Sequence, residues 1–270
     1  MNQHLFDAVQ EVEQRIINAN HVLVCLDYDG TLTHFAANPL GAHLSQQMER
    51  VLLSLSEHGH ASLAIVSGRD RADLQSRISI PGVFYAGNHG LEISGPGYMF
   101  VEPTAAENSN ALKELAQQLE AKLASITGAI VENKGLTISV HYRQVAAEQV
   151  DEVRSLVHAT LAAAKHPFVL SRGEKVFEIR PRVYWNKGNA VGWIQEKIDK
   201  PDILAIYVGD DTTDEDAFAA LDDGITVKVG EALETAARYK VSGTAEVRKL
   251  LEWLDEVLEH KALRQAEACA

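Results

Sequence analysis

The most constraining feature of this chain is a repeated alternation of helix-like segments with short apolar runs. The runs are HVLVCL (21–26), ASLAIV (61–66), ILAIYV (203–208) and ITVKV (225–229). Such runs are typical of parallel strands that are buried on both faces of a sheet. The segments between them are amphipathic; residues 5–17, for example, place apolar side chains at steps of three and four. The alternation predicts a doubly wound α/β fold with a parallel sheet.

The middle of the chain has a different pattern. In residues 136–142, apolar side chains alternate with polar ones, which is typical of a strand with one face on a core and one face open. We therefore expect a small α+β domain, inserted at 105–180 into a core formed by 1–104 and 181–270. Its expected helices are 107–126 and 146–164, and its expected strands are 129–133, 136–142, 167–171 and 175–180.

Composition narrows the class of protein. The chain has 270 residues, 46% apolar and 23% charged, which is ordinary for a soluble enzyme of two modest domains. The net charge of -13 argues against nucleic acid as a partner. No apolar run approaches the roughly 20 residues that span a bilayer. The two cysteines, Cys25 and Cys269, and the lack of a signal-like start favour the cytoplasm. We expect a small-molecule partner and a monomer.

The first apolar run ends in Asp27-Tyr28-Asp29-Gly30-Thr31. Ligands of open α/β sheets bind at the carboxyl ends of strands. Residues two apart in an extended segment project to the same side, so Asp27 and Asp29 are expected to converge. Two close carboxylates repel each other unless a cation or a proton lies between them. The alternative is a simple turn with a helix cap.

Two further clusters follow strands. Ser67-Gly68-Arg69 offers a hydroxyl, a flexible glycine and a cation to a phosphate oxygen, although a helix N-cap with a surface arginine explains it equally well. The acidic run 209–216 suggests a hard cation with oxygen ligands. Helix-dipole preference explains Asp214 and its neighbours, but explains Asp210-Asp211 less readily. Lys187 lies at the start of a predicted helix. A lone lysine there is usually solvated, and it becomes a candidate site residue only together with these clusters.

Together these elements resemble, in order and spacing, the haloacid-dehalogenase-like (HAD) phosphatases. The pattern is an Asp-x-Asp-Gly-Thr loop, a Ser after the second strand, a Lys and an acidic Gly-Asp-Asp loop, and all four occur here. The resemblance implies that Asp27 is the nucleophile, forming an aspartyl-phosphate, and that Asp29 is the general acid and base. The resemblance also implies that Mg²⁺ is bound by Asp27, by the main-chain carbonyl of Asp29 and by Asp210. Asp211 and Asp214 are expected to orient these ligands. The phosphoryl group is expected to be held by Ser67 and Lys187, with Arg69 nearby.

Longer strings are similar to the trehalose-6-phosphate phosphatases within that superfamily. They are GNHGLE (87–92), VENK (131–134), VHYR (140–143), FEIRP (177–181) and YVGDDTTDEDAF (207–218). The resemblance implies that the insert is a cap that determines the substrate, a sugar phosphate. It places sugar-binding roles on Glu132, Lys134 and Glu178, and the matching strings add Arg143, Asn88 and His89 as candidates.

Glu174 departs from this pattern, because relatives often carry a basic residue there. A different sugar ester, such as sucrose-phosphate or a glycosyl-phosphoglycerate, therefore stays open as the substrate. A phosphomannomutase-like transferase is a further alternative, but the chain lacks an obvious second phosphate clamp. The alternative from another class is a non-catalytic sugar-phosphate sensor. That alternative is weakened by the presence of Asp27, Asp29 and Asp210.

Overall fold

The computed structural model describes residues 2–34, 41–173 and 175–268. Glu174 and Cys269 therefore lie outside the described residues, while Cys25 is a buried free thiol. The chain divides into two compact units. The first comprises Met1–Phe100 and Trp185–Ala270, and the second comprises Val101–Tyr184.

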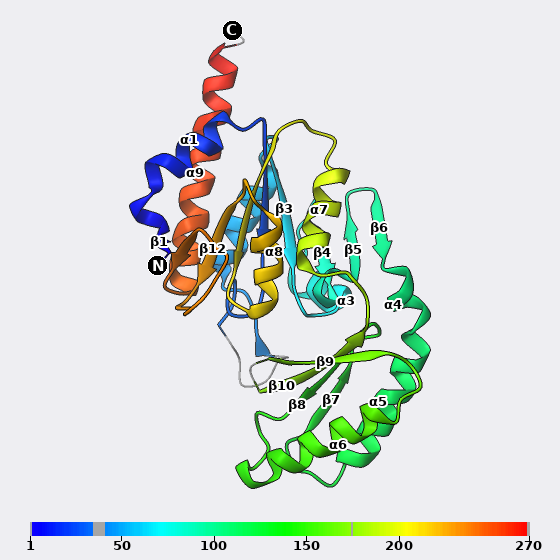
Figure 1. Cartoon of the computed structure of the whole chain (residues 1–270). Helices are drawn as coiled ribbons and strands as arrows, with labels where there is room; N and C mark the ends of the chain where they lie inside the picture. Colours follow the sequence, from blue (N-terminus) through cyan, green and yellow to red (C-terminus); the bar gives the residue numbers. More distant parts are fainter. Residues whose placement is uncertain (1, 35–40, 174, 269–270) are drawn as a thin grey trace. The chain divides into compact units, whose positions relative to one another are not determined.

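The first unit is built on a nine-stranded sheet in the order β1-β13-β12-β11-β2-β3-β4-β5-β6 (Figure 1). The strands from β1 to β4 in this order pair in parallel, and β5 joins β4 antiparallel. The strands are β1 Gln3–His4, β2 His21–Leu26, β3 Ala61–Val66, β4 Phe84–Gly87, β5 Glu92–Gly95, β6 Tyr98–Val101, β11 Ile203–Gly209, β12 Ile225–Val229 and β13 Tyr239–Val241.

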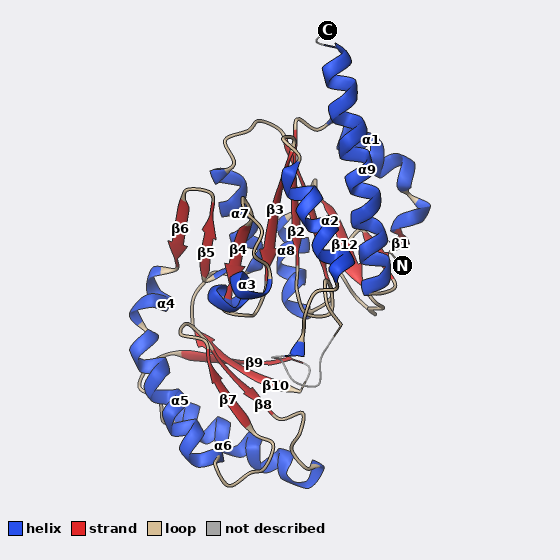
Figure 2. Ribbon diagram, turned by 180° about the vertical axis from the view of Figure 1, so that it is seen from behind, coloured by secondary structure: helices blue, strands red, loops and turns tan. Residues whose placement is uncertain are grey.

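Both faces of this sheet carry a hydrophobic core, as the continuous apolar runs predict. Alternate residues of β2 divide between the two: Val22 and Val24 pack into one core, and Leu23 and Cys25 into the other. The first core is closed by α1, α2 and α9 with Leu74 of α3 (Figure 2), and the second by α7 and α8 (Figure 1). These helices are α1 Val9–Asn18, α2 Gln46–Glu57, α3 Arg71–Arg77, α7 Lys187–Lys197, α8 Glu215–Ala220 and α9 Thr244–Ala268.

The predicted helices are present, with differences at their ends. The expected helix at 5–17 starts later, because Gln3–His4 pairs with β13 and a short 3-10 turn, η1 Leu5–Asp7, intervenes. Side-chain caps fix three helix starts: Ser45, Asp70 and Asn186 each accept a hydrogen bond from a main-chain N–H of the first turn. Within the described part of the chain, no helix combines the length and apolar character needed to cross a membrane.

The second unit packs two helices on a four-stranded sheet in the order β7-β8-β10-β9, paired antiparallel throughout. Leucines at 112, 115, 119 and 123 line the helix face that packs with Val153 and Val157 against the sheet. The expected helix 107–126 is divided at Asn108. The elements are α4 Pro103–Glu107, α5 Ser109–Leu123, β7 Ile130–Asn133, β8 Ile138–His141, the 3-10 turn η4 Ala147–Gln149, α6 Val150–Ala162, β9 Phe168–Gly173 and β10 Val176–Pro181.

The other face of this sheet is polar, but it is less open than the alternation suggested. Ser139, on β8, lies opposite Glu132 of β7 and Glu178 of β10. Ser139 is only 1% exposed and Thr137 is fully buried. The expectation that all the polar side chains of this strand are open is therefore wrong. For Ser139 the reason is its size, because a short side chain in a middle strand lies between two longer glutamate side chains.

Candidate active site

Asp27 follows directly on β2, beside β11. Its main-chain N–H donates to the carbonyl of Val208 at 2.9 Å, which extends the parallel pairing by one residue. Its carboxylate is buried and accepts a hydrogen bond from Nζ of Lys187 at 2.7 Å. Tyr28 turns the other way, into the core, where its hydroxyl donates to the carbonyl of Ala42 at 3.0 Å.

Lys187 is the first residue of α7 and is held there by a reciprocal cap between Asn186 and Asn189. Its ammonium group is 1% exposed and donates to Asp27 and, at 2.6 Å, to Asp214. Burial alone would lower the pKa of Lys187, but the two carboxylates outweigh it and raise the pKa. Lys187 is thus a permanent cation inside the site, within reach of an anionic group bound beside Asp27.

Asp27, Asp210 and Asp214 form a cluster in which one carboxylate oxygen of each lies within 4.8 Å of the others. Burial, together with Asp214 and Asp210, raises the pKa of Asp27 although Lys187 opposes this. Burial and Asp214 raise the pKa of Asp210 to about 7. Three carboxylates face one lysine, so the cluster is short of positive charge. Carboxylate oxygens are the ligands that Mg²⁺ prefers, and the donor set fits that ion.

Asp210 reaches this cluster because Gly30 leaves room for it. A Cβ on Gly30 would lie 2.2 Å from Oδ2 of Asp210, and Gly30 has φ +87, in the left-handed region that favours glycine. Thr31 donates its hydroxyl to Oδ1 of Asp210 at 3.1 Å. The Asp-x-Asp-Gly-Thr sequence therefore supplies the nucleophile candidate, Asp27, and also the space and the hydrogen bond that hold the Asp210 carboxylate.

The remaining acids of the 209–216 loop have different surroundings. Asp214 is fully buried and accepts hydrogen bonds from Lys187, from the Tyr207 hydroxyl at 2.8 Å and from the Asp211 main-chain N–H at 2.8 Å. Asp211 caps the 3-10 turn η5 Thr212–Asp214. Asp214 is therefore saturated by protein donors, which suits a supporting position better than a metal ligand.

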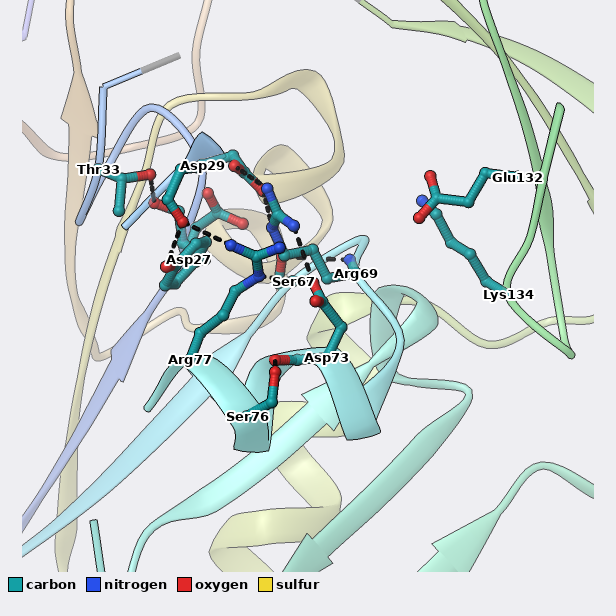
Figure 3. A network of polar contacts seen from close by, with 12 residues as sticks. Asp27, Asp29, Thr33, Ser67, Arg69, Asp73, Ser76, Arg77, Glu132 and Lys134 are labelled. Carbon is teal, nitrogen blue, oxygen red and sulfur yellow. Dashed lines mark hydrogen bonds and ion pairs between the residues drawn. The ribbon is translucent and has the colours of Figure 1, made fainter. Parts of the chain in front are cut away.

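Asp29 is turned toward a different cation. Arg69 donates to it through Nε at 2.6 Å and Nη2 at 2.8 Å, and through Nη1 to Asp73 at 2.8 Å. Asp73 in turn accepts from Arg77 at 2.8 Å (Figure 3). Among the described residues, the clustered carboxylates that could hold a metal do not include that of Asp29. The expected convergence of Asp27 and Asp29 is thus not seen in their carboxylates, and Arg69, expected near phosphate, donates to two carboxylates.

Ser67 lies where β3 ends, and the segment after β4 packs against it. Ser67 is 2% exposed, and its carbonyl accepts the main-chain N–H of His89 at 2.9 Å. A Cβ on Gly68 would lie 2.6 Å from the His89 ring, so a larger residue at 68 would displace that ring. Asn88 is fully buried and donates its side-chain amide to Glu92 at 2.7 Å. The structure therefore places Asn88 in a supporting position beside the Ser67 loop.

The candidate sugar-binding residues of the insert share one sheet face. Lys134 approaches Glu178 at 3.4 Å, Ser139 donates to the same glutamate at 3.4 Å, and His141 lies 2.8 Å from Glu132. These side chains form two neighbouring pairs, Lys134–Glu178 and His141–Glu132, on β7, β8 and β10 and just after β7. Arg143 follows β8 and is exposed.

Three residues of these networks were not predicted. Tyr207 lies inside an apolar strand run, where a tyrosine carries no signal of a polar role. Asp73 and Arg77 read as ordinary helix charges spaced four apart. Only the tertiary structure shows that Tyr207 supports Asp214 and that the other two extend the Asp29–Arg69 pair.

The chain is similar to known proteins over most of its length. The family model described as Trehalose-phosphatase matches residues 25–252. A protein of Mycobacterium tuberculosis named as an uncharacterized glycosyl hydrolase is 38% identical over 223 residues, covering 80% of this chain but only 16% of that protein. A probable trehalose-phosphate phosphatase of Arabidopsis thaliana is 34% identical, covering 92% of this chain and 71% of its own length.

Solved structures agree with the fold. A trehalose-6-phosphate phosphatase related protein superposes with a TM-score of 0.78 at 25% identity, covering 88% of this chain and 99% of its own. A haloacid dehalogenase-like hydrolase of Bacteroides thetaiotaomicron matches in fold, with a TM-score of 0.59 at 20% identity, covering 87% of this chain and 99% of its own. The predicted HAD-like α/β fold is confirmed. Since the family model covers most of the sequence, the chain belongs to the trehalose-phosphatase family.

Proposed function

We propose that this protein is a phosphatase that hydrolyses trehalose 6-phosphate to trehalose and phosphate. The observation that carries the proposal is the group formed by buried Asp27 and Lys187 and half-buried Asp210, at the carboxyl ends of β2 and β11 and the start of α7. It combines a carboxylate nucleophile, a fixed cation for the phosphoryl oxygens and a second carboxylate. Family membership and the names of the relatives support the substrate.

In the proposed reaction, an oxygen of Asp27 attacks phosphorus while the bond from phosphorus to the sugar oxygen breaks. Asp29 gives its proton to the departing sugar oxygen, which is a poor leaving group without it. A water molecule then attacks the aspartyl-phosphate, Asp29 takes a proton from that water, and the bond to Asp27 breaks to release phosphate. Before the first step, Asp29 has to leave its bonds to Arg69 and gain a proton.

The proposal includes Mg²⁺, held by Asp27, the main-chain carbonyl of Asp29 and Asp210. A bound Mg²⁺ would supply positive charge against the phosphoryl oxygens and screen the carboxylates from one another. Lys187 would hold the phosphoryl oxygens, and the Ser67 hydroxyl would donate to one of them. Asp211 and Asp214 orient these groups, Asp214 through Lys187 and Tyr207.

We assign sugar recognition to the inserted unit, through Glu132, Lys134 and Glu178. Carboxylate and ammonium groups make several directed hydrogen bonds, which suits the many hydroxyls of a disaccharide. Their placement on one sheet face supports this role. Cytoplasmic location and a monomeric state stay predictions of the sequence.

The test is phosphate release from trehalose 6-phosphate, sucrose 6-phosphate, glucose 6-phosphate and glucosyl-3-phosphoglycerate, with Mg²⁺ and with chelator. We expect the trehalose ester to be preferred and its hydrolysis to stop with chelator. Preference for another ester would be consistent with the mechanism but would refute trehalose 6-phosphate as the substrate. No release from any ester by folded protein would refute the phosphatase and favour the sugar-phosphate sensor.

A further inference from the structure

Lys228 has no role in the mechanism above, yet it lies beside the metal-site candidate. It belongs to β12, and the parallel register pairs it with Gly209, the last residue before the acidic loop. The residue is only 7% exposed. A buried lysine needs partners that compensate for its lost hydration, so its contacts indicate what it does.

Those contacts are main-chain carbonyls of the acidic loop. Nζ of Lys228 donates to the carbonyl of Asp210 and lies 3.4 Å from that of Asp211. One ammonium group that binds two successive carbonyls restricts the rotation of the peptide between them. Because the Asp210 side chain starts at the same residue, this contact also limits the directions in which its carboxylate can point.

Lys228 also lies near a glutamate that is itself held by hydrogen bonds. Oε1 of Glu215 lies 3.9 Å from its ammonium group. Oε2 of the same glutamate accepts hydrogen bonds from the main-chain N–H of Ala236 at 2.7 Å and the hydroxyl of Thr235 at 3.1 Å. Glu215 is therefore anchored to the segment before β13. The ammonium lies between this anchored carboxylate and the two loop carbonyls.

We propose that Lys228 is a positioning residue for the Mg²⁺ site, which aims the Asp210 carboxylate at the cluster by holding the backbone of residues 210 and 211. This inference rests on the proposed function. Asp210 is then fixed on three sides: by Lys228 at its carbonyl, by Thr31 at its carboxylate and by Gly30, which leaves it space.

The proposal predicts the direction in which the Mg²⁺ affinity changes when Lys228 is replaced. As a mere neighbouring charge, Lys228 repels Mg²⁺, and its removal would tighten binding of the ion. As a positioning residue it strengthens binding, because loss of a supporting contact around a metal site typically weakens affinity about 10–100-fold. The direction of the change in Mg²⁺ affinity therefore separates the two roles, whatever happens to stability.

The experiment compares the full chain with Lys228→Met, Lys228→Arg and Lys240→Met. Lys240 is the matched control, since it pairs with Lys228 in the register of β12 and β13 but forms its ion pair with exposed Glu231. Mg²⁺ binding is measured by calorimetry without substrate, and the Mg²⁺ dependence of phosphate release is measured alongside. We expect the Kd for Mg²⁺ to rise about 10-fold or more in Lys228→Met. It should stay near the wild-type value in Lys228→Arg and Lys240→Met, and KM for the ester at saturating Mg²⁺ should be unchanged.

Equal or tighter Mg²⁺ binding by folded Lys228→Met overturns the inference while leaving the proposed function intact. A fall in melting temperature without a change in Mg²⁺ affinity does the same, because it shows a structural role only. If Lys228→Met does not fold, Lys228→Gln takes its place under the same criteria. If the wild-type protein binds no Mg²⁺, both the inference and the metal dependence of the proposed function fail.

Discussion

The two units each contain a lysine paired with an acidic residue, and the two pairs differ in burial and in the side chains beside them. In the first unit, Lys187 lies 2.7 Å from Asp27, with 1% and 6% of the side chains exposed. In the second, Lys134 lies 3.4 Å from Glu178, with 9% and 15% exposed. The first pair has two further buried or half-buried acids beside it, Asp210 and Asp214. The second has the Glu132–His141 pair as its neighbour.

Sheet geometry explains the difference. Parallel strands bring their carboxyl ends to one edge, so loops from several strands meet there, and in this chain they bring together the acids Asp27, Asp210 and Asp214. Antiparallel strands instead set side chains in rows across one face, and here Glu178 lies beside Lys134 and Glu132 beside His141. The first arrangement suits a bound cation and a reacting phosphoryl group. The second suits a neutral, hydroxyl-rich ligand.

The largest expected effect follows from removing the nucleophile candidate. Asp27→Asn should lower kcat for trehalose 6-phosphate by about 10⁴-fold or more. The same variant should be more stable than the wild type without Mg²⁺, because the raised pKa of Asp27 shows that the site disfavours its charge. Phosphate release and urea denaturation measure the two effects. Retained activity in Asp27→Asn would remove the proposed mechanism.

Removing the cations should separate the two pairs in stability. Lys187→Met leaves Asp27 and Asp214 buried without their lysine and should cost about 3–5 kcal/mol of unfolding free energy. Lys134→Met loses a longer, more exposed pair and should cost about 1 kcal/mol. Both are measured by urea denaturation at neutral pH without Mg²⁺. Equal losses would contradict the distinction between the two regions.

A substitution on the polar sheet face of the second unit should weaken binding of the sugar without changing the chemical step. Glu178→Gln should raise KM for trehalose 6-phosphate about 10-fold, since a hydrogen bond to a charged group contributes about 1.5–3 kcal/mol. The kcat/KM for p-nitrophenyl phosphate, which has no sugar, should change less than about twofold. Glu148→Gln is the control, because Glu148 is an exposed acid in the turn η4 of the same unit. Equal losses with both esters would show that Glu178 acts on folding or chemistry rather than on the sugar.

The smallest expected effect is on the pH dependence of stability. Burial and Asp214 raise the pKa of Asp210 to about 7, so the folded protein binds more protons than the unfolded chain between about pH 4 and pH 7. The contribution of Asp210 to stability without metal therefore falls as pH rises through this window. The gain in melting temperature on adding Mg²⁺ should be larger at pH 8 than at pH 5. Each kcal/mol of unfolding free energy that Mg²⁺ binding adds corresponds to about 2–4 °C in melting temperature. Asp210→Asn should reduce that difference, and an equal gain at both pH values would count against it.

The sequence alone determined the architecture and the identity of the central acids. Continuous apolar runs between amphipathic segments specify buried parallel strands, and the acids at the ends of two runs identify one edge of the sheet. Periodicity is a local property, so it can be read without coordinates. The positions of Glu132 and Glu178 on one face of the insert could be read in the same way, because strands alternate with a period of two.

Only the tertiary structure decided how these side chains are paired. Asp29 faces Arg69 rather than Asp27, Asp214 is saturated by Lys187 and Tyr207, and Lys228 holds the acidic loop from a neighbouring strand. Each of these partners is separated in the sequence by a strand, a helix or a loop whose path the pattern does not specify. A hydrogen bond depends on distances within a few tenths of an ångström, which sheet register and helix packing set together. The residue pattern thus identified the candidate groups, and the packing of the fold determined which of them interact.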